Sequence, residues 1–129
     1  MSLVDYRRTL AADGRLVVSP KGRLVVSVPL GERHHRVCIQ RLGAWVRVLG
    51  WVAGLSSLEE RISVTRLLDL LTHANGESEQ FSLMRSEGWL ALVCDLPGSA
   101  TPEEVVEAVW ETARRADRLE RVWAGVDEQ

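Results

Sequence analysis

The chain has 129 residues, of which 46% are hydrophobic and 26% are charged, and its formal net charge is −2. These values are typical of one globular domain, residues 1–129, and exclude a disordered or fibrous protein. No apolar run approaches the roughly 20 residues of a membrane-spanning helix, so we expect no membrane association. The charged first residues lack the apolar core of a secretory signal.

The first half of the chain predicts a short helix followed by four strands. The helix spans residues 2–12, and the sheet and the other helices occupy residues 14–125. Short segments rich in β-branched residues, separated by turn-forming residues, predict strands at residues 15–19, 23–29, 34–41 and 44–52. The hexapeptide that starts at Gly14 recurs unchanged at Gly22. Two identical strands could pair in more than one register, so the turn between them must determine the pairing.

The second half predicts a helix, a hairpin and a second helix. The first of these helices opens at Ser56 and ends at Asn75, where a glycine follows. Residues 79–85 and 89–96 are strand-like and are joined by a short glycine-containing turn, which is typical of a hairpin.

The start of the last helix is the clearest local signal in the chain. Thr101 can accept a hydrogen bond from a free backbone N–H, and Pro102 stands at the first helical position, where its missing N–H costs nothing. Glu104 completes a capping box, and Gly125 is predicted to end the helix. Apolar residues three or four positions apart form one stripe along it: Val105, Val109, Ala113, Ala116, Leu119 and Trp123.

These elements predict an α+β fold. Its order is α-β-β-β-β-α-β-β-α, and the tight turns between neighbouring strands favour an antiparallel sheet of five to six strands flanked by helices. Side chains alternate across a strand, so Val46, Val48 and Val52 share one face of the fourth strand, which we expect to be core.

The opposite face of the fourth strand is the candidate partner-binding surface. It carries Trp45, Arg47, Leu49 and Trp51, and tryptophan and arginine are enriched at protein interfaces. Neighbouring strands could extend this face with Val25, Arg36 and Cys38. Two interpretations stay open: the tryptophans contact a partner protein, or a helix covers both of them as a second layer of core.

The sequence predicts no catalytic site, no metal site and no cofactor. His34 and His35 are adjacent and point to opposite faces of a strand, and His73 stands alone, so the histidines cannot share a metal. There is no phosphate-binding glycine loop and no nucleophile elbow. Cys38 and Cys94 lie on separate predicted strands without metal-ligand spacing, which favours buried free thiols in the reducing cytoplasm.

Charge is distributed unevenly along the chain. Residues 1–54 hold nine basic and three acidic residues, a balance of +6, whereas residues 55–129 hold seven basic and fifteen acidic residues, a balance of −8. A basic half can mark a nucleic-acid-binding face. The same asymmetry also arises when one half is helical and rich in glutamate, because helices tolerate glutamate well.

Several phrases of the second half resemble one protein family in their order and spacing. They are Leu67 to Asn75, the pair of strands from Phe81 to Pro97, the helix start at Thr101 and the segment from Ala116 to Glu120. They resemble the YbjN-like family of sensory transduction regulators and, more broadly, the type III secretion chaperone-like fold. The resemblance covers roughly residues 14–125. The short first helix departs from the family pattern and leaves the packing of the N-terminus open.

The resemblance implies a small dimeric α+β protein that binds protein segments without catalysis. We therefore expect a non-enzymatic protein-binding module, chaperone-like or regulatory, with an unidentified client. The alternative is a nucleic-acid-binding regulator that uses the basic first half. A homodimer is also expected from the central helix, which has apolar residues on more than one face: Leu67, Leu68, Leu70 and Leu71.

Overall fold

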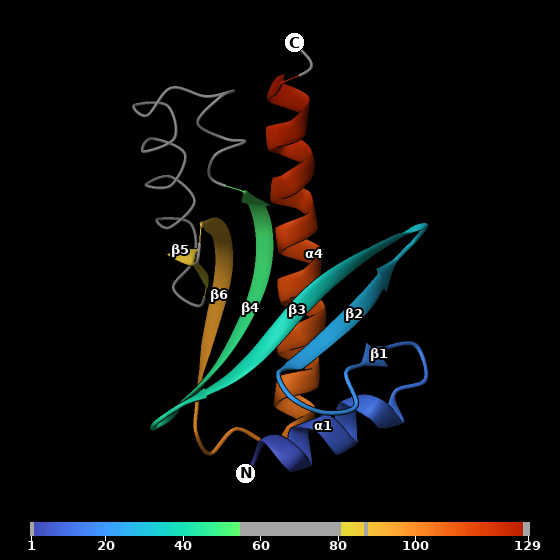
Figure 1. Cartoon of the computed structure of the whole chain (residues 1–129), viewed down its shortest axis with the longest axis vertical. Coiled ribbons are helices and arrows are strands. Elements are labelled where there is room, and N and C mark those ends of the chain that lie inside the picture. Colours follow the sequence, from blue (N-terminus) through green and yellow to red (C-terminus); the bar gives the residue numbers. More distant parts are fainter. Residues whose placement is uncertain (1, 55–80, 87, 128–129) are drawn as a thin grey trace.

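The computed structural model describes residues 2–54, 81–86 and 88–127 (Figure 1). The predicted central helix lies outside these residues, and so do the predicted dimer contacts Leu67, Leu68, Leu70 and Leu71. The family-like phrase that ends at Asn75 also lies outside them.

The described residues form the predicted α+β fold, with an N-terminal helix, a six-stranded antiparallel sheet and a C-terminal helix packed on the sheet. Each strand pairs antiparallel with its neighbours in the order β1-β2-β3-β4-β6-β5. The elements are α1 (Leu3–Ala12), β1 (Val17–Val18), β2 (Leu24–Leu30), β3 (Arg33–Leu42), β4 (Trp45–Gly54), β5 (Phe81–Ser86), β6 (Trp89–Pro97) and α4 (Pro102–Asp127).

The repeated hexapeptide forms one short and one long strand. β1 contains only Val17 and Val18, because the backbone N–H of Leu16 donates to the carbonyl of Asp13 in a turn and does not pair with β2. The predicted strand at 15–19 is therefore shorter than expected. Beyond β1, the N–H of Ser19 donates to the carbonyl of Val25 at 2.9 Å, which sets the register of the two copies.

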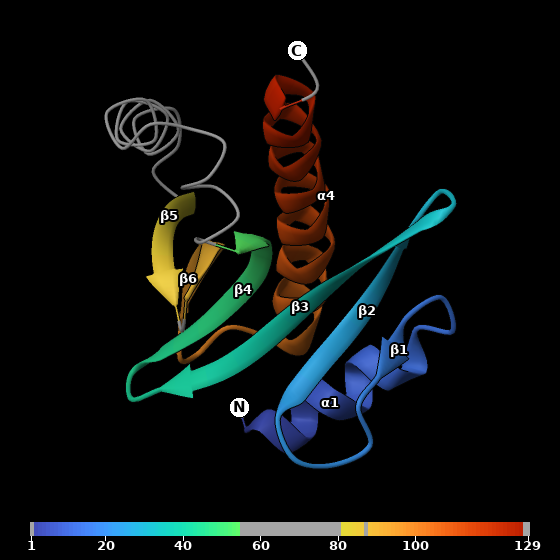
Figure 2. The ribbon, with the colours of Figure 1, turned by 45° about the horizontal axis from the view of Figure 1, so that its top comes forward.

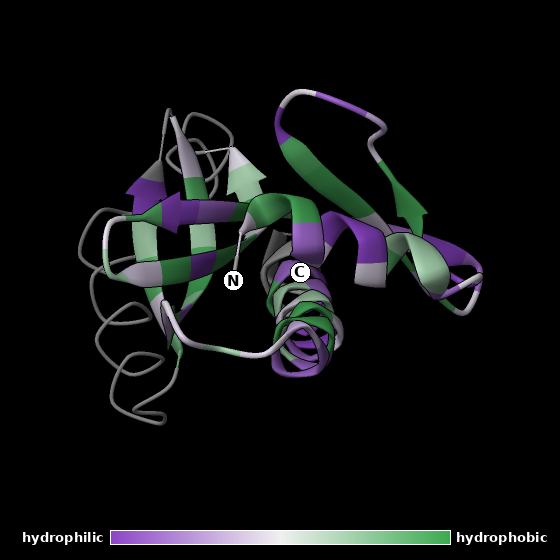
Figure 3. Cartoon of the chain, turned by 90° about the horizontal axis from the view of Figure 1, so that it is seen from below, coloured by the Kyte–Doolittle hydropathy of each residue, from purple (hydrophilic) through white to green (hydrophobic). Residues whose placement is uncertain are grey.

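α4 covers one face of the sheet, and α1 packs near the start of α4 beside β1 and β2 (Figures 1 and 2). Buried and half-buried residues alternate along β2, and hydrophobic residues are frequent in the strands (Figure 3). The predicted core face is confirmed, because Val46 and Val48 are fully buried and Val52 is 3% exposed. This main core also contains Tyr6, Leu10, Leu24, Val26, Val28, Val37, Ile39, Leu90, Val105, Val109, Ala113 and Ala116.

The capping box of α4 is present, but the helix does not end where the sequence predicted. The N–H of Glu104 donates to Thr101 Oγ1 at 3.2 Å, and the Glu104 carboxylate accepts from the N–H of Thr101 at 3.2 Å. α4 continues through Gly125 to Asp127. A glycine ends a helix only where it adopts a left-handed conformation, and Gly125 keeps helical geometry.

Replacing Thr112 by valine is expected to stabilise the protein. The Thr112 hydroxyl is fully buried in α4 and has no hydrogen-bond partner among the described residues. An unpaired buried hydroxyl is destabilising, and valine has the same shape without it, so we expect a gain of about 1 kcal/mol. Circular dichroism melts should show a Tm about 3–5 °C higher.

Thr112→Ser is the control for this prediction. It keeps the hydroxyl and removes the methyl group that faces Gly50, so it is expected to lose about 1 kcal/mol. A valine variant that melts below the wild type would contradict the assignment of an unpaired hydroxyl.

Candidate functional site on the second face of the sheet

The face of the sheet opposite α4 contains a small buried cluster. Leu49, Ala91 and Val93 are at most 3% exposed, and Trp51 and Met84 pack against them. Leu49 was predicted to contact a partner, and this prediction is wrong, because a side chain that is buried within the sheet cannot contact a partner.

Trp45 lies on the same face at the end of β4 that follows the β3–β4 turn. Its side chain is 54% exposed, and the neighbouring Leu42 is 43% exposed. The interpretation in which a helix buries both Trp45 and Trp51 as a second core layer is therefore wrong for Trp45. Trp51 is half-buried.

Arg47 is engaged within the sheet. Its guanidinium donates to both carboxylate oxygens of Asp95, directly across on β6, at 2.8 and 2.9 Å. The same group contacts the Met84 sulfur at 3.5 Å. The hydrogen bond to Asp95 raises the pKa of Arg47 above its usual value. Arg47 thus has a carboxylate partner already and orders the surface beside Trp45.

Trp51 and Val25, two of the predicted partner-binding residues, line one hollow with a volume of about 440 Å³. The hollow also contains Trp89, 46% exposed, which sequence reasoning missed. Strand parity could have found it, since Trp89 shares its face with Ala91 and Val93 on β6. The other described residues that line it are Arg23, His34, His35, Arg36 and Glu120.

The hollow forms where β3 and β4 separate. Their pairing ends at Val37 and Gly50, although β3 begins at Arg33 and β4 continues to Gly54. The two ribbons diverge beyond this point (Figure 1). The His35 ring bridges the gap, because its Nε2 lies 2.7 Å from the carbonyl oxygen of Trp51.

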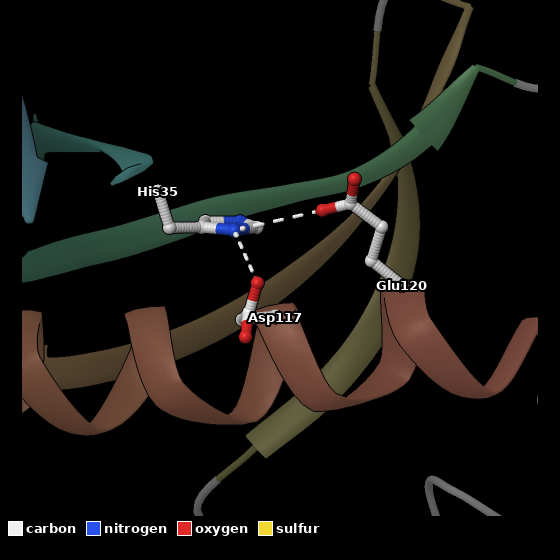
Figure 4. Close-up of side chains that lie close together, drawn as sticks. All are labelled: His35, Asp117 and Glu120. Carbon is white, nitrogen blue, oxygen red and sulfur yellow. Dashed lines mark ion pairs between the residues drawn. The ribbon is translucent and has the colours of Figure 1, made fainter. Parts of the chain in front are cut away.

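The other ring nitrogen of His35 faces two carboxylates from α4 (Figure 4). Nδ1 lies 3.6 Å from an oxygen of Glu120 and 4.0 Å from an oxygen of Asp117. His35 and Asp117 are buried, at 6% and 5% exposure. Residues 117 and 120 are three positions apart, which places both side chains on one face of the helix.

Two arginines surround the carboxylates. Arg33 lies 3.0 Å from Asp117 and 3.6 Å from Glu120, and Arg121 lies 2.7 Å from the second oxygen of Asp117. Both arginine side chains are about half exposed, at 47% and 58%. We call His35, Asp117 and Glu120 the His35 cluster. The sequence did not indicate it, because its members come from a strand and a helix that are far apart in the chain.

Cys38 and Cys94 are both buried thiols and form no disulfide, as predicted. Burial raises the pKa of the Cys94 thiol above its ordinary value. The thiolate is the reactive form, so Cys94 is a poor nucleophile at neutral pH.

No protein-family model matches this chain, and no curated protein matches it either. None of the described helices is long and apolar enough to cross a membrane.

Proposed function

We propose that this chain is a non-enzymatic protein-binding module that holds a segment of a partner protein in the hollow lined by Trp51 and Trp89. The observation that carries the proposal is the pairing of two partly exposed tryptophans with basic side chains in one concave site. Tryptophan and arginine contribute most to binding when they line such pockets. The resemblance to YbjN-like regulators and to secretion chaperones supports the same class of function.

The chemistry of the hollow favours a partner segment that combines an apolar side chain with acidic ones. Trp51, Trp89 and Val25 provide the apolar surface, and Arg23 and Arg36 provide positive charge at its edge. A carboxylate of the partner can accept two parallel hydrogen bonds from a guanidinium. Arg36 is exposed and sits beside the tryptophans, so it is the residue we assign to this role.

Peptide selection on the purified full-length protein tests the proposal. A displayed random peptide library is expected to yield peptides with aspartate or glutamate beside an aromatic or aliphatic residue. For a selected peptide, Trp89→Ala is expected to weaken binding by about 2 kcal/mol, roughly 30-fold in Kd, because truncating a pocket tryptophan removes a main contact. Arg36→Glu is expected to weaken it at least about tenfold, since the new charge repels the peptide's carboxylates. Fluorescence anisotropy measures both.

Trp45→Ala is the matched control, because Trp45 is exposed on the same face but does not line this hollow. It should bind the peptide as the wild type does. Since Trp89 and Arg36 are exposed, neither substitution is expected to change stability by more than about 0.5 kcal/mol. Failure to select any peptide, or unchanged affinity in both Trp89→Ala and Arg36→Glu, would contradict the proposal.

A single-stranded nucleic acid is the second candidate ligand, because bases stack on tryptophan and phosphates pair with arginine. Among the residues that the structure describes, two arginines line the hollow. Strong salt-dependent binding typically involves six to ten phosphate contacts, which is more than these two arginines provide. We therefore rank a protein segment first. Micromolar binding of a labelled oligonucleotide, falling steeply with added salt, would reverse this order.

The homodimer also belongs to the proposed function. It rests on the apolar residues Leu67, Leu68, Leu70 and Leu71 of the sequence and stays a prediction. Light scattering at tens of micromolar protein distinguishes a dimer from a monomer.

A further inference from the structure

The His35 cluster brings one imidazole nitrogen near two carboxylates. Nδ1 lies 3.6 Å from Glu120 and 4.0 Å from Asp117, and these distances are too long for hydrogen bonds. One ligand atom of each of the three residues lies within 4.8 Å of the others. Two ligands of a tetrahedral zinc ion, each about 2.0–2.1 Å from it, are about 3.3–3.5 Å apart. Small inward movements would therefore bring the three atoms to bonding distance of a shared ion.

The tautomer of His35 suits a metal ligand. A backbone carbonyl only accepts hydrogen bonds, so Nε2 must carry the proton that it shares with the Trp51 carbonyl at 2.7 Å. In the neutral ring, Nδ1 then carries the free lone pair, and it is the ring nitrogen that lies near the two carboxylates (Figure 4). Metal-binding histidines commonly donate their other N–H to a backbone carbonyl, which fixes the ring in this way.

The cluster is held by rigid elements and has a route to solvent. His35 belongs to β3, and Asp117 belongs to the part of α4 that also contributes Ala116 to the core. Glu120 is 43% exposed and forms part of the wall of the hollow. An ion could enter from the hollow and bind residues whose backbones do not need to move.

We infer that His35, Asp117 and Glu120 form a binding site for a divalent transition-metal ion of the Zn²⁺ class. One imidazole nitrogen and two carboxylate oxygens suit zinc, whereas calcium and magnesium prefer sites made of oxygen alone. Three protein ligands leave a fourth position for water or for a ligand from a bound partner. The inference does not depend on the proposed protein-binding function.

Arg33 and Arg121 compete with the metal in this site. Both contact Asp117, and Arg33 also contacts Glu120. Since both side chains are about half exposed, they can turn toward solvent when the ion binds. This competition makes the site weaker than a closed structural zinc site. The competition also provides a test, because removing one of the arginines should strengthen metal binding. An ion-pair network that binds no metal would not respond in this way.

Isothermal titration of the tag-free full-length protein with Zn²⁺ tests the inference. The background variant carries His34→Ala and His73→Ala, so that His35 is its only histidine. One zinc ion per chain is expected to bind this variant as it binds the wild type. Adding His35→Ala should weaken zinc binding at least about tenfold. Changing a residue that only hydrogen-bonds to a metal ligand already lowers metal affinity about that much, so removing a ligand should cost no less. Co²⁺ should give visible absorption bands that disappear in the same variant.

Glu120→Gln is the second ligand variant. Glu120 is partly exposed, so its replacement should lower zinc affinity without unfolding the protein, which a thermal melt checks. Arg33→Gln removes a competing cation and is expected to tighten zinc binding severalfold, the opposite direction from the ligand variants. The inference fails if the wild type binds no zinc, if His35→Ala and Glu120→Gln bind it unchanged, or if Arg33→Gln binds it more weakly.

Discussion

Replacing Gly50 by valine is expected to destabilise the protein by about 3 kcal/mol or more, which lowers Tm by about 10 °C. Gly50 lies in the middle of β4, opposite Val37 on one side and Leu92 on the other. A Cβ atom at this position would lie 3.1 Å from both Ala116 Cβ and Thr112 Cγ2 on α4. Ala116 Cβ is bonded to the backbone of α4, so it cannot move away unless the helix moves. Urea denaturation measures the loss.

Gly54→Ala is the matched control for Gly50. Gly54 ends the same strand, and an added Cβ there would meet no atom of the described residues within 4 Å. Alanine is expected to stabilise the protein by about 0.5 kcal/mol, because it restricts the unfolded chain. If only the strand propensity of the residue mattered, Gly50→Val would stabilise the protein, because valine is favoured over glycine in strands. A Gly50→Val variant as stable as the wild type would mean that α4 does not approach β4 this closely.

Replacing Tyr6 by alanine is the second large effect that we expect. Tyr6 is fully buried in α1, and its hydroxyl donates to the carbonyl of Ala100 at 2.9 Å, just before α4 begins. Loss of the ring leaves a cavity and should cost about 3–5 kcal/mol. That is a large part of the 5–15 kcal/mol by which a typical domain is stable. Chemical denaturation measures the loss.

Tyr6→Phe separates the hydrogen bond from the packing of the ring. It keeps the ring but leaves the buried Ala100 carbonyl without its donor, so we expect a loss of about 1–2 kcal/mol. Val4→Ala is the surface control, since Val4 is 64% exposed in the same helix, and should change stability by less than about 0.5 kcal/mol. Equal losses for Tyr6→Ala and Val4→Ala would mean that α1 does not belong to the core.

The two faces of the sheet have different roles. One face is closed by α4 and carries the main core, and its stability depends on close contacts such as the one at Gly50. Within the described part of the chain, the other face carries a small buried cluster around Leu49 and partly exposed tryptophans. The proposed partner site and the inferred metal site both lie where β3 and β4 separate, so a bound ion would stiffen one wall of the hollow.

Some elements could be predicted from the sequence because their signals are local. The capping box at Thr101, the glycine-containing turns and the alternation along β4 involve neighbours within a few residues, and the structure contains all of them. The predicted end of α4 was wrong, because a glycine can either continue a helix or end it. The predicted length of the first strand was wrong, because the backbone N–H of Leu16 donates to Asp13 in a turn and β1 contains only Val17 and Val18.

The same difference between local and distant signals applies to the candidate sites. Strand parity alone determined that Trp45 and Trp51 share the face opposite Val46 and Val48. Only the tertiary structure decided that Leu49 is buried there, that Arg47 is bound to Asp95, and that Trp89 completes the hollow. Burial depends on which distant segments cover a side chain, and a period of two residues carries no information about that.

The sequence by itself determined the order of the strands, the start of the last helix and the side of β4 that faces the core. It could not place His35 beside Asp117 and Glu120, because that contact depends on how α4 packs across β4 and on the point at which β3 leaves β4. Local periodicity sets the direction of a side chain relative to its own strand or helix. Contacts between elements far apart in the chain are set by the packing of the whole core, through close approaches such as the one at Gly50.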